Sequence, residues 1–352
     1  MASTDNNEVL ILGSGTLAEE LASSFRRLGY VVRVGSLSGD AALAAGTPAL
    51  TVVCESAPSE KLAELEATTG TRLVPTVEAC EITRNREGIR RTAAEEHGLP
   101  TMAYEFADSP GELRTCAERV GYPCVVKPGT STGGEGQSVV TGPAELDEAW
   151  RKASTSGEEG RVGVERYVDF DFECTILAAR SIDPETGQLA TWFCEPIGTH
   201  HEDGHLVEVW QPAPLSADAM DNARSIAARI TNAIGVQGIY AIDLFVDGDE
   251  VYFSQVSARP TLDGMVTGAT QRVNEFDLHA RAVLGLPIDV TLTSPGAARF
   301  VSAPASHTGL ADALAVPETG VEVAGDTVVV RSTGENVAEA RERAREAAAR
   351  LG

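Results

Sequence analysis

Residues 9–15 read Val-Leu-Ile-Leu-Gly-Ser-Gly, an apolar strand that ends in two glycines one residue apart. A helical stretch follows from about 17 to 28, and a second apolar strand covers 31–34. Strand, glycine turn, helix and strand in this order predict a doubly wound parallel sheet, and so an α/β fold. Residues 49–53 and 72–74 are expected to add strands to it.

The glycine turn itself has two interpretations. Gly13 and Gly15 are followed by Ala18 where a dinucleotide fingerprint has its third glycine. Such a turn lets the backbone approach an anion at the start of a helix. It is equally typical of a plain tight turn between strand and helix, and the sequence leaves both open.

Composition describes a globular chain with a strongly acidic surface. The 352 residues are 43% hydrophobic and 23% charged, enough for two or three domains. The formal net charge of −24 disfavours nucleic acid and anionic membrane partners. The N-terminus shows no signal peptide, no apolar run reaches the roughly 20 residues of a membrane span, and the six cysteines form no CxxC. These features predict a cytoplasmic protein with reduced thiols.

Residues 129–137 form a loop with four glycines directly after an apolar strand, 124–127. Bare backbone N–H groups on a flexible hairpin can fold over phosphates, although the Walker pattern is missing. Lys127, at the strand end, suits a nucleotide phosphate as a point charge. A mobile surface hairpin and a solvated lysine are the alternatives.

A second hairpin carries more chemistry. Asp-Gly at 247–248 joins two alternating runs, so Asp243 and Gln255 are expected on one face of neighbouring strands. Two oxygen ligands suit Mg²⁺ held partly by nucleotide phosphates, and Arg259 could stabilise a developing negative charge. An ordinary amphipathic hairpin would look similar. The adjacent pair His200-His201 is interpreted as a polar loop, not as a zinc site.

The remaining elements follow from periodicity and glycine or proline stops. Helices are expected at about 85–96, 112–120, 144–153, 217–234 and 337–350, and further strands at 138–140, 162–166, 173–178, 189–194, 238–246, 250–256 and 327–330.

Several of these stretches together resemble one family. They are RNREGIRR at 84–91, GYPCVVKP at 121–128, FDFE at 170–173, EDG at 202–204 with WQP at 210–212, and GMVT at 264–267. In order, over about residues 8–290, they are similar to the formate-dependent phosphoribosylglycinamide formyltransferases, which are ATP-grasp enzymes.

The resemblance implies three parts and a reaction. A Rossmann-like domain would occupy 1–112, an ATP-grasp domain 113–295 with a small lid at 113–168, and a small β-rich domain 296–352. ATP would phosphorylate formate to formyl phosphate, which an amine then attacks. The cofactors implied are ATP and Mg²⁺, and the assembly implied is a homodimer.

The resemblance also assigns residues by matching position. Arg86 and Lys127 would contact the nucleotide phosphates, with Thr132, Gly134 and Gln137 in the covering loop. Glu165 and Val168 would lie at the adenine and Glu173 at the ribose. Asp243 and Gln255 would hold Mg²⁺, and Arg259 would lie beside the acyl phosphate. Gly15, Thr16, Glu55 and Asp263 fall at the acceptor site.

Five departures from the family pattern fall mostly on the acceptor side. Gln255 replaces a glutamate, Thr16 replaces a glutamate after the glycine turn, and Ala57 replaces an acid near Glu55. The segment 258–264 reads ARPTLDG where the family has PRPHDTG, and a C-terminal segment with a lysine and an Arg-Arg pair is missing. Hydrogen bonds to charged groups are worth ~1.5–3 kcal/mol each, so the loss of the lysine and the two arginines should weaken the binding of a substrate phosphate by several kcal/mol.

The sequence therefore predicts an ATP-dependent carboxylate–amine ligase whose acceptor is not phosphoribosylglycinamide. Three alternatives stay open: the family's own formylation of phosphoribosylglycinamide, a catalytically impaired nucleotide-binding homologue, and bicarbonate in place of formate as the activated carboxylate.

Overall fold

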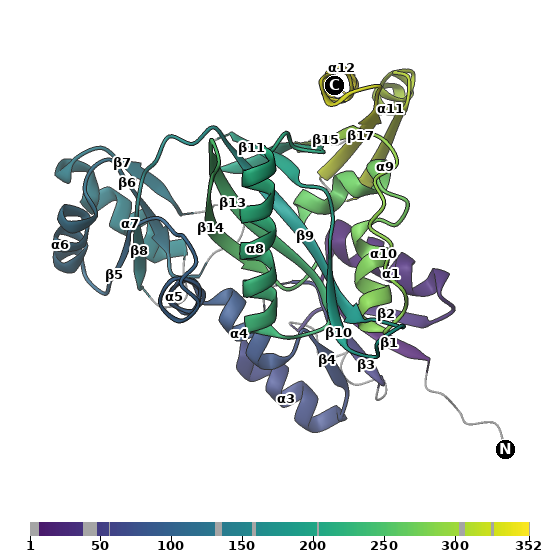
Figure 1. Cartoon of the computed structure of the whole chain (residues 1–352), viewed down its shortest axis with the longest axis horizontal. Coiled ribbons are helices and arrows are strands. Elements are labelled where there is room, and N and C mark those ends of the chain that lie inside the picture. The colour runs from purple at the N-terminus through teal and green to yellow at the C-terminus, as the bar shows by residue number, and fades with distance from the viewer. Residues whose placement is uncertain are drawn as a thin grey trace.

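Three sheets form the fold in a computed structural model that describes residues 7–37, 48–55, 57–130, 136–156, 160–202, 204–302, 307–324 and 327–351 (Figure 1). The first sheet is the parallel one predicted from residues 9–15, with strand order β2-β1-β3-β4. Its elements are β1 (Glu8–Leu12), α1 (Gly15–Arg27), β2 (Val31–Gly35), β3 (Leu50–Val53), α3 (Ser59–Thr69), β4 (Arg72–Val74) and α4 (Val77–Arg84). At the end of β1, a side chain on Gly13 would collide with the Cys54 sulfur, so glycine is required there.

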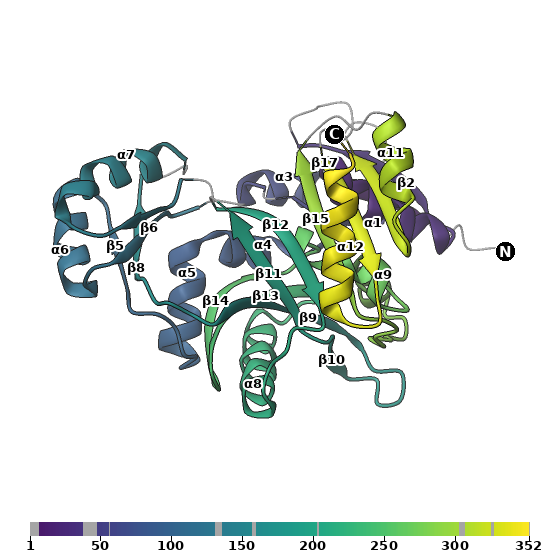
Figure 2. The same ribbon diagram turned by 90° about the horizontal axis from the view of Figure 1, so that it is seen from above.

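A second sheet forms the small lid, which stands apart from the rest of the molecule at the left of Figures 1 and 2. Its antiparallel strands follow the order β5-β8-β6-β7 and carry two helices on one face. The elements are β5 (Tyr104–Ala107), α6 (Pro110–Val120), β6 (Cys124–Pro128), β7 (Ser138–Val140), the short η2 (Pro143–Glu145), α7 (Leu146–Ser156) and β8 (Val162–Arg166). A buried cluster of apolar residues, including Leu113, Val126 and Val164, makes the lid a unit with its own core.

The third sheet has nine strands and is the body of the molecule. Its main path runs β14-β13-β9-β11-β12-β15-β17-β16, and β10 pairs with β9 beside that path. The bounds are β9 (Phe172–Ile182), β10 (Leu189–Phe193), β11 (Ile197–Glu202), β12 (His205–Gln211), β13 (Gly238–Asp247), β14 (Glu250–Ser257), β15 (Gly296–Ser302), β16 (Thr319–Ala324) and β17 (Thr327–Thr333).

Alternation along β9 and β13 gives the two faces of this sheet different partners. Ile176 on β9 and Ile242 on β13 pack against α8 (Ala217–Ile234). Leu177 and Ala241, one residue away on each strand, face the opposite core with Phe276 of α10 (Glu275–Val283) and the N-terminal domain. Asp243, two residues beyond Ala241, therefore lies on this second face.

The C-terminal strands continue the nine-stranded sheet. Residues 296–352 were predicted as a small β-rich domain, and the strands are present, but β15 pairs directly with β12. Two helices, α11 (His307–Leu314) and α12 (Val337–Ala349), accompany them (Figure 2). Glu208 on β12, almost fully buried, holds α12 in place by pairing with Arg341 at 2.7 Å and Arg345 at 2.8 Å.

Short helices connect the sheets. They are α5 (Arg86–Arg91), continued by a π-helical turn η1 (Thr92–Glu96), and η3 (Leu262–Val266), followed by α9 (Thr267–Thr270). The helix expected over 85–96 is thus confirmed, with a change of pitch at Thr92.

The prediction of a polar loop at His200-His201 is wrong, because both residues lie in strand β11. This strand is an inner one, paired with β9 and β12, and its register shifts between the two histidines. Both side chains remain partly exposed and pair with carboxylates, His200 with Glu202 at 3.5 Å and His201 with Glu173 at 3.0 Å. Polar residues fit this strand because its end borders an open cleft.

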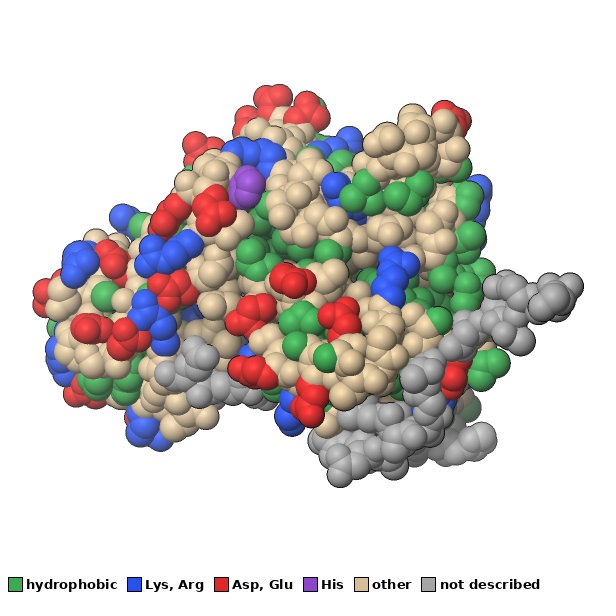
Figure 3. Space-filling view, turned by 90° about the horizontal axis from the view of Figure 1, so that it is seen from below, with side chains coloured by type: hydrophobic (Ala, Val, Ile, Leu, Met, Phe, Trp, Pro, Cys, Tyr) green, Lys and Arg blue, Asp and Glu red, His purple; other side chains and the backbone are tan. Residues whose placement is uncertain are grey.

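The surface carries both signs of charge. On the face in Figure 3, Lys and Arg side chains are scattered among Asp and Glu. No helix within the described parts of the chain combines the length and the apolar character that a membrane crossing requires. All six cysteines are free thiols, and five of them are buried.

Candidate active site

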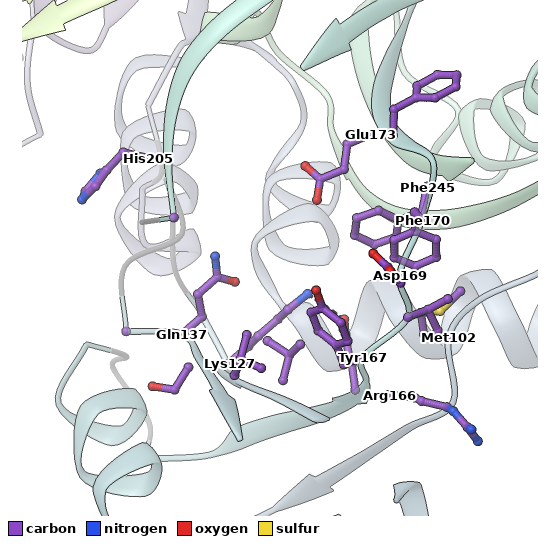
Figure 4. Close-up of a pocket in the computed structure, with 18 of the residues that line it drawn as sticks. Met102, Lys127, Gln137, Arg166, Tyr167, Asp169, Phe170, Glu173, His205 and Phe245 are labelled. Atoms are coloured by element: carbon purple, nitrogen blue, oxygen red, sulfur yellow. Dashed lines mark hydrogen bonds and ion pairs between the residues drawn. The ribbon is translucent and has the colours of Figure 1, made fainter. Parts of the chain in front are cut away.

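A cleft of about 940 Å³ opens between the lid sheet and the central sheet (Figure 4). It collects five of the residues predicted to bind the nucleotide: Lys127, Gln137, Glu165, Val168 and Glu173. The strands β6 and β8 of the lid supply one wall, and the ends of β9 and β13 supply the other. The predicted residues Thr132 and Gly134 of the glycine loop lie outside the described residues.

One end of the cleft is flat and apolar. Phe170 and Phe245 stack with ring centroids 4.2 Å apart and planes 3° from parallel, and Met102 lies beside them (Figure 4). A flat apolar surface of this kind suits one face of a purine ring. Glu173 lines the same cleft and pairs with His201 at 3.0 Å. Burial opposes a charge on His201, but the Glu173 carboxylate raises the pKa of His201 above its usual value.

Lys127 also lines the cleft and is bound to Glu165. Its ammonium donates to Glu165 Oε2 at 2.6 Å, and Arg90 Nη2 donates to Glu165 Oε1 at 2.7 Å. All three side chains are almost fully buried. Glu165 was expected at the adenine, and the structure shows that both oxygens of its carboxylate already hold cations.

The electrostatics of this group follow from burial and mutual attraction. Burial alone would raise the pKa of Glu165, but Arg90, Lys127 and Arg86 outweigh it and hold that pKa far below the usual range. Burial lowers the pKa of the Lys127 ammonium, although Glu165 favours its charged form. Three cations face one carboxylate, so the group carries a net positive charge that a nucleotide phosphate can neutralise.

Arg86, predicted to contact phosphate, holds the start of the glycine loop. Its Nε donates to the carbonyl of Pro128 at 2.9 Å, and its backbone N–H donates to the carbonyl of Gly129 at 3.1 Å. The side chain is partly buried, and this desolvation lowers its pKa. Arg86 therefore fixes the point at which the chain leaves β6 for residues 129–137.

Asp243 and Gln255 are cross-strand partners on β13 and β14, as predicted. A β-bulge follows at once, because Leu244 pairs with Phe253 and Ser254 is the extra residue. Bulges often re-aim a side chain next to an active site. Thr175 on β9 completes the row, donating to Asp243 Oδ1 at 2.8 Å.

This donor set fits Mg²⁺. A carboxylate oxygen and an amide oxygen are both hard ligands, and Mg²⁺ is commonly held by one or two protein groups plus substrate phosphates. Burial, and next the nearby Asp263 carboxylate, raise the pKa of Asp243 well above its ordinary value, which a bound cation would reverse. No group of three or more His, Cys, Asp or Glu side chains within the described ranges forms a metal cage of its own.

Arg259 lies where the central sheet meets the N-terminal domain. Its Nη1 donates to the carbonyl of Cys54 at 3.2 Å, and Glu55 is near enough to interact with its charge. The following loop is fixed by the buried Glu275, which accepts from the backbone N–H of Thr261 at 3.2 Å. A Cβ atom at Gly264 would lie 2.1 Å from a Glu275 oxygen, so glycine is required there too.

On the predicted acceptor side, the guanidinium of Arg331 is already paired with carboxylates. Gly15 and the buried Thr16 begin α1, and Glu20 follows one turn later. Arg331 on β17 binds Glu322 on β16 at 2.7 Å and approaches Glu20 at 3.7 Å. Burial, and next the hydrogen bond to Glu322, raise the pKa of Glu20 to about 7.

Two further departures are visible here. Ala57, where the family pattern has an acid, is buried among apolar side chains of the N-terminal domain. Ala324 pairs with Thr327, so only residues 325 and 326 connect β16 to β17, and this connection has no room for the missing basic segment.

Sequence reasoning missed three contributors to the site. Phe170 could have been proposed from FDFE, since an aromatic near the acid expected at the ribose suits a base, but its stacking partner Phe245 lies on β13, outside any of the quoted motifs. Arg90 stands inside the quoted RNREGIRR, but no spacing rule connects it with Glu165, which lies 75 residues away.

Comparison with protein families and curated sequences gives consistent matches. The profile of the ATP-grasp domain matches residues 92–276. A formate-dependent phosphoribosylglycinamide formyltransferase from Corynebacterium efficiens is 46% identical and covers 99% of this chain and 96% of its own length. One from Paraburkholderia xenovorans is 42% identical and covers 97% and 94%.

Solved structures agree on the fold. A structure described as glycinamide-RNase-transformylase T from Mycobacterium tuberculosis superposes with a TM-score of 0.83 at 37% identity, covering 98% of this chain and all of that one. Carboxyaminoimidazole ribonucleotide synthase from Aspergillus clavatus, complexed with ATP, reaches 0.85 at 20% identity over 98% and 99%. The second likeness concerns the fold alone.

Proposed function

We propose, from the premise that this chain belongs to the formate-dependent phosphoribosylglycinamide formyltransferase family of ATP-grasp enzymes, that it uses ATP to activate formate as formyl phosphate and passes the formyl group to an amine. The family is one of ATP-dependent enzymes that form C–N bonds with Mg²⁺. The identity of carboxylate and acceptor is the part proposed here.

The observation that carries the proposal is a series of charged and polar groups, of which Lys127 lines the cleft and the others lie outside its lining. Lys127 and Arg86 stand at its lid side, Asp243 and Gln255 follow on the central sheet, and Arg259 lies beyond them toward the N-terminal domain. In this order the groups suit a triphosphate whose terminal phosphorus points at Arg259.

The chain's own groups mainly position the reactants and offset their charge. A formate oxygen attacks the terminal phosphorus of ATP, giving formyl phosphate and ADP, while Lys127 neutralises phosphate charge. The amine then attacks the formyl carbon, phosphate leaves and the nitrogen loses a proton. Arg259 is placed to stabilise the oxyanion that develops on the formyl oxygen. When bound by Asp243 and Gln255, Mg²⁺ supplies further charge neutralisation at the phosphates.

Phosphoribosylglycinamide is the first candidate acceptor, because relatives named for it match this chain over nearly its whole length. A second candidate is an amine without a phosphate group. The two-residue connection between β16 and β17 favours it, as does the engagement of Arg331 with Glu322 and Glu20. A phosphate monoester needs charge-assisted donors, and these residues offer it none that is unengaged.

The test is steady-state release of ADP with formate and phosphoribosylglycinamide, with its dephosphorylated form, and with a panel of other amines. We expect ADP release that depends on both formate and an amine, with ¹³C from labelled formate in the product. Label entering from bicarbonate would identify a different carboxylate. Absence of amine-stimulated ADP release with every carboxylate, also after Gln255→Glu, would instead support an impaired nucleotide-binding homologue.

A homodimer is the assembly we propose, because of the family resemblance. Light scattering coupled to size-exclusion chromatography measures it directly.

A further inference from the structure

Arg90 connects two parts of the nucleotide site that belong to different sheets. Through Nη2 it donates to Glu165 Oε1 on the lid strand β8 at 2.7 Å. Through Nη1 it donates to the carbonyl of Phe253 at 2.8 Å, and Nη2 also reaches the carbonyl of Ser254 at 2.9 Å. The side chain is 1% exposed, and these contacts engage both of its terminal nitrogens, while its Nε is buried without a partner among the described residues.

The two carbonyls belong to the β-bulge of β14. Ser254 is the extra residue of that bulge, and the next residue is Gln255, the partner of Asp243. A bulge disrupts the ladder locally and leaves backbone groups to be satisfied otherwise. Arg90 satisfies them with a planar fork of donors, which fixes the bulge and with it the direction of Gln255.

The other end of the fork acts on Lys127. Glu165 has two oxygens, and Arg90 holds one while Lys127 holds the second at 2.6 Å. Removing Arg90 would free Glu165 to turn toward Lys127 alone, which would bind that ammonium more tightly to the protein and withdraw it from a phosphate. The helix that carries Arg90 also carries Arg86 at the start of the glycine loop.

We propose that Arg90 is a positioning residue of the nucleotide site, setting the phosphate-binding Lys127 and the metal-binding Gln255 at a fixed separation from each other. It would touch neither the nucleotide nor the metal. The inference rests only on the nucleotide-binding part of the proposed function.

A purely structural buried ion pair is the competing explanation, since breaking one destabilises a protein in any location. The two explanations differ in what they predict for the folded protein. Breaking a purely structural pair lowers the melting temperature, but the protein that remains folded binds the nucleotide normally. Substituting a positioning residue changes nucleotide and metal affinity in protein that is still folded. The size of that change depends on Lys127 and Gln255 being present.

The experiment measures binding of AMP-PNP with Mg²⁺ by titration calorimetry, with folding checked by circular dichroism. Arg90→Lys keeps the charge but not the fork, and Glu165→Gln keeps the shape but not the charge. Either variant serves if the other fails to fold. Arg91→Lys is the matched control, because Arg91 is the next residue of the same helix and pairs only at the surface with Glu87 and Glu95.

We expect Arg90→Lys to weaken nucleotide affinity by about 10- to 100-fold, the loss of one or two charged hydrogen bonds, while Arg91→Lys changes it less than about threefold. In a Lys127→Ala background the same Arg90 change should cost much less than in the unmodified chain. Equal losses in both backgrounds, or unchanged affinity in folded Arg90→Lys, would overturn the inference while leaving the proposed function standing. Failure of the unmodified chain to bind the nucleotide would overturn both.

Discussion

Asp243 and Gln255 face each other across β13 and β14 as direct partners, one ionisable and one neutral. A single carboxylate therefore provides the formal negative charge of this pair, whereas the family pattern places an acid on each strand. The amide oxygen of Gln255 can still ligate Mg²⁺, but with less charge.

Gln255→Glu is expected to tighten Mg²⁺ binding in the presence of AMP-PNP by about tenfold or more, because a second carboxylate adds charge to the same pair of ligands. Titration of Mg²⁺ by calorimetry measures the change directly. Gln255→Ala is the matched control and should weaken binding. Identical metal affinities in all three proteins would show that this strand position does not ligate the metal.

The hairpin that carries this pair could be predicted from sequence because its signals are local. Asp-Gly between two alternating runs sets the register, and the register brings residues 243 and 255 together. The bulge at Ser254 could not be predicted, since its carbonyl accepts a hydrogen bond from Arg90 of α5, which is 164 residues away in the sequence. Local chemistry gives the pairing, and tertiary contacts decide how the side chains are aimed.

Polar segments beside a cleft are where periodicity misleads. His200-His201-Glu202 looks like a loop because it lacks apolar alternation, yet it forms the end of an inner strand. Its side chains face a polar opening and not a core, so no hydrophobic pattern marks it. A different reason hides the double role of Glu165. Its partner Arg90 is distant in the sequence and comes near only after folding.

Arg259→Gln should separate catalysis from binding. Arg259 is not among the residues that line the cleft, and it contacts the carbonyl of Cys54. Nucleotide affinity is therefore expected to change less than about threefold, while formyl transfer falls about 10²- to 10³-fold, the usual cost of removing one charge-stabilising donor. Calorimetry with AMP-PNP and product formation from ¹³C-formate give the two readouts. Arg272→Gln, a change at an exposed arginine, is the control.

A parallel loss of nucleotide binding in Arg259→Gln would contradict this assignment. It would mean that the arginine holds the nucleotide or the fold, and that another group faces the acyl phosphate.

Glu20, on the predicted acceptor side, gives a pH-dependent prediction. Burial, and next its hydrogen bond with Glu322, raise its pKa from 4.5 to about 7. The folded state thus binds the proton more tightly than the unfolded state. The stabilisation is fully present below pH of about 4.5 and is lost as the pH rises through about 7.

Glu20→Gln should therefore be nearly neutral at pH 5 and stabilising at pH 8, by roughly 1–3 kcal/mol in the free energy of unfolding. Urea unfolding at the two pH values measures it. Glu19→Gln is the matched control on the same helix, since Glu19 is largely exposed and pairs only with Arg26. An equal effect of Glu20→Gln at both pH values would exclude a titrating pair with Glu322.

Among the described residues, those of β16 and β17 offer the acceptor's phosphate group no basic side chain that is unengaged. Residues 325 and 326 alone connect β16 and β17, and the nearby Arg331 is engaged by Glu322 and Glu20. For the second candidate acceptor, an amine without a phosphate group, we expect removal of the phosphate from phosphoribosylglycinamide to change kcat/KM by less than about tenfold. Three charged hydrogen bonds at ~1.5–3 kcal/mol each would instead make the difference about 10³-fold or more.

The 46% identical relative from Corynebacterium efficiens is the comparison enzyme for both acceptors. A thousandfold preference of this chain for the phosphorylated acceptor would contradict the prediction, and would require a basic group that reaches the acceptor from elsewhere in the chain or from a second copy of it.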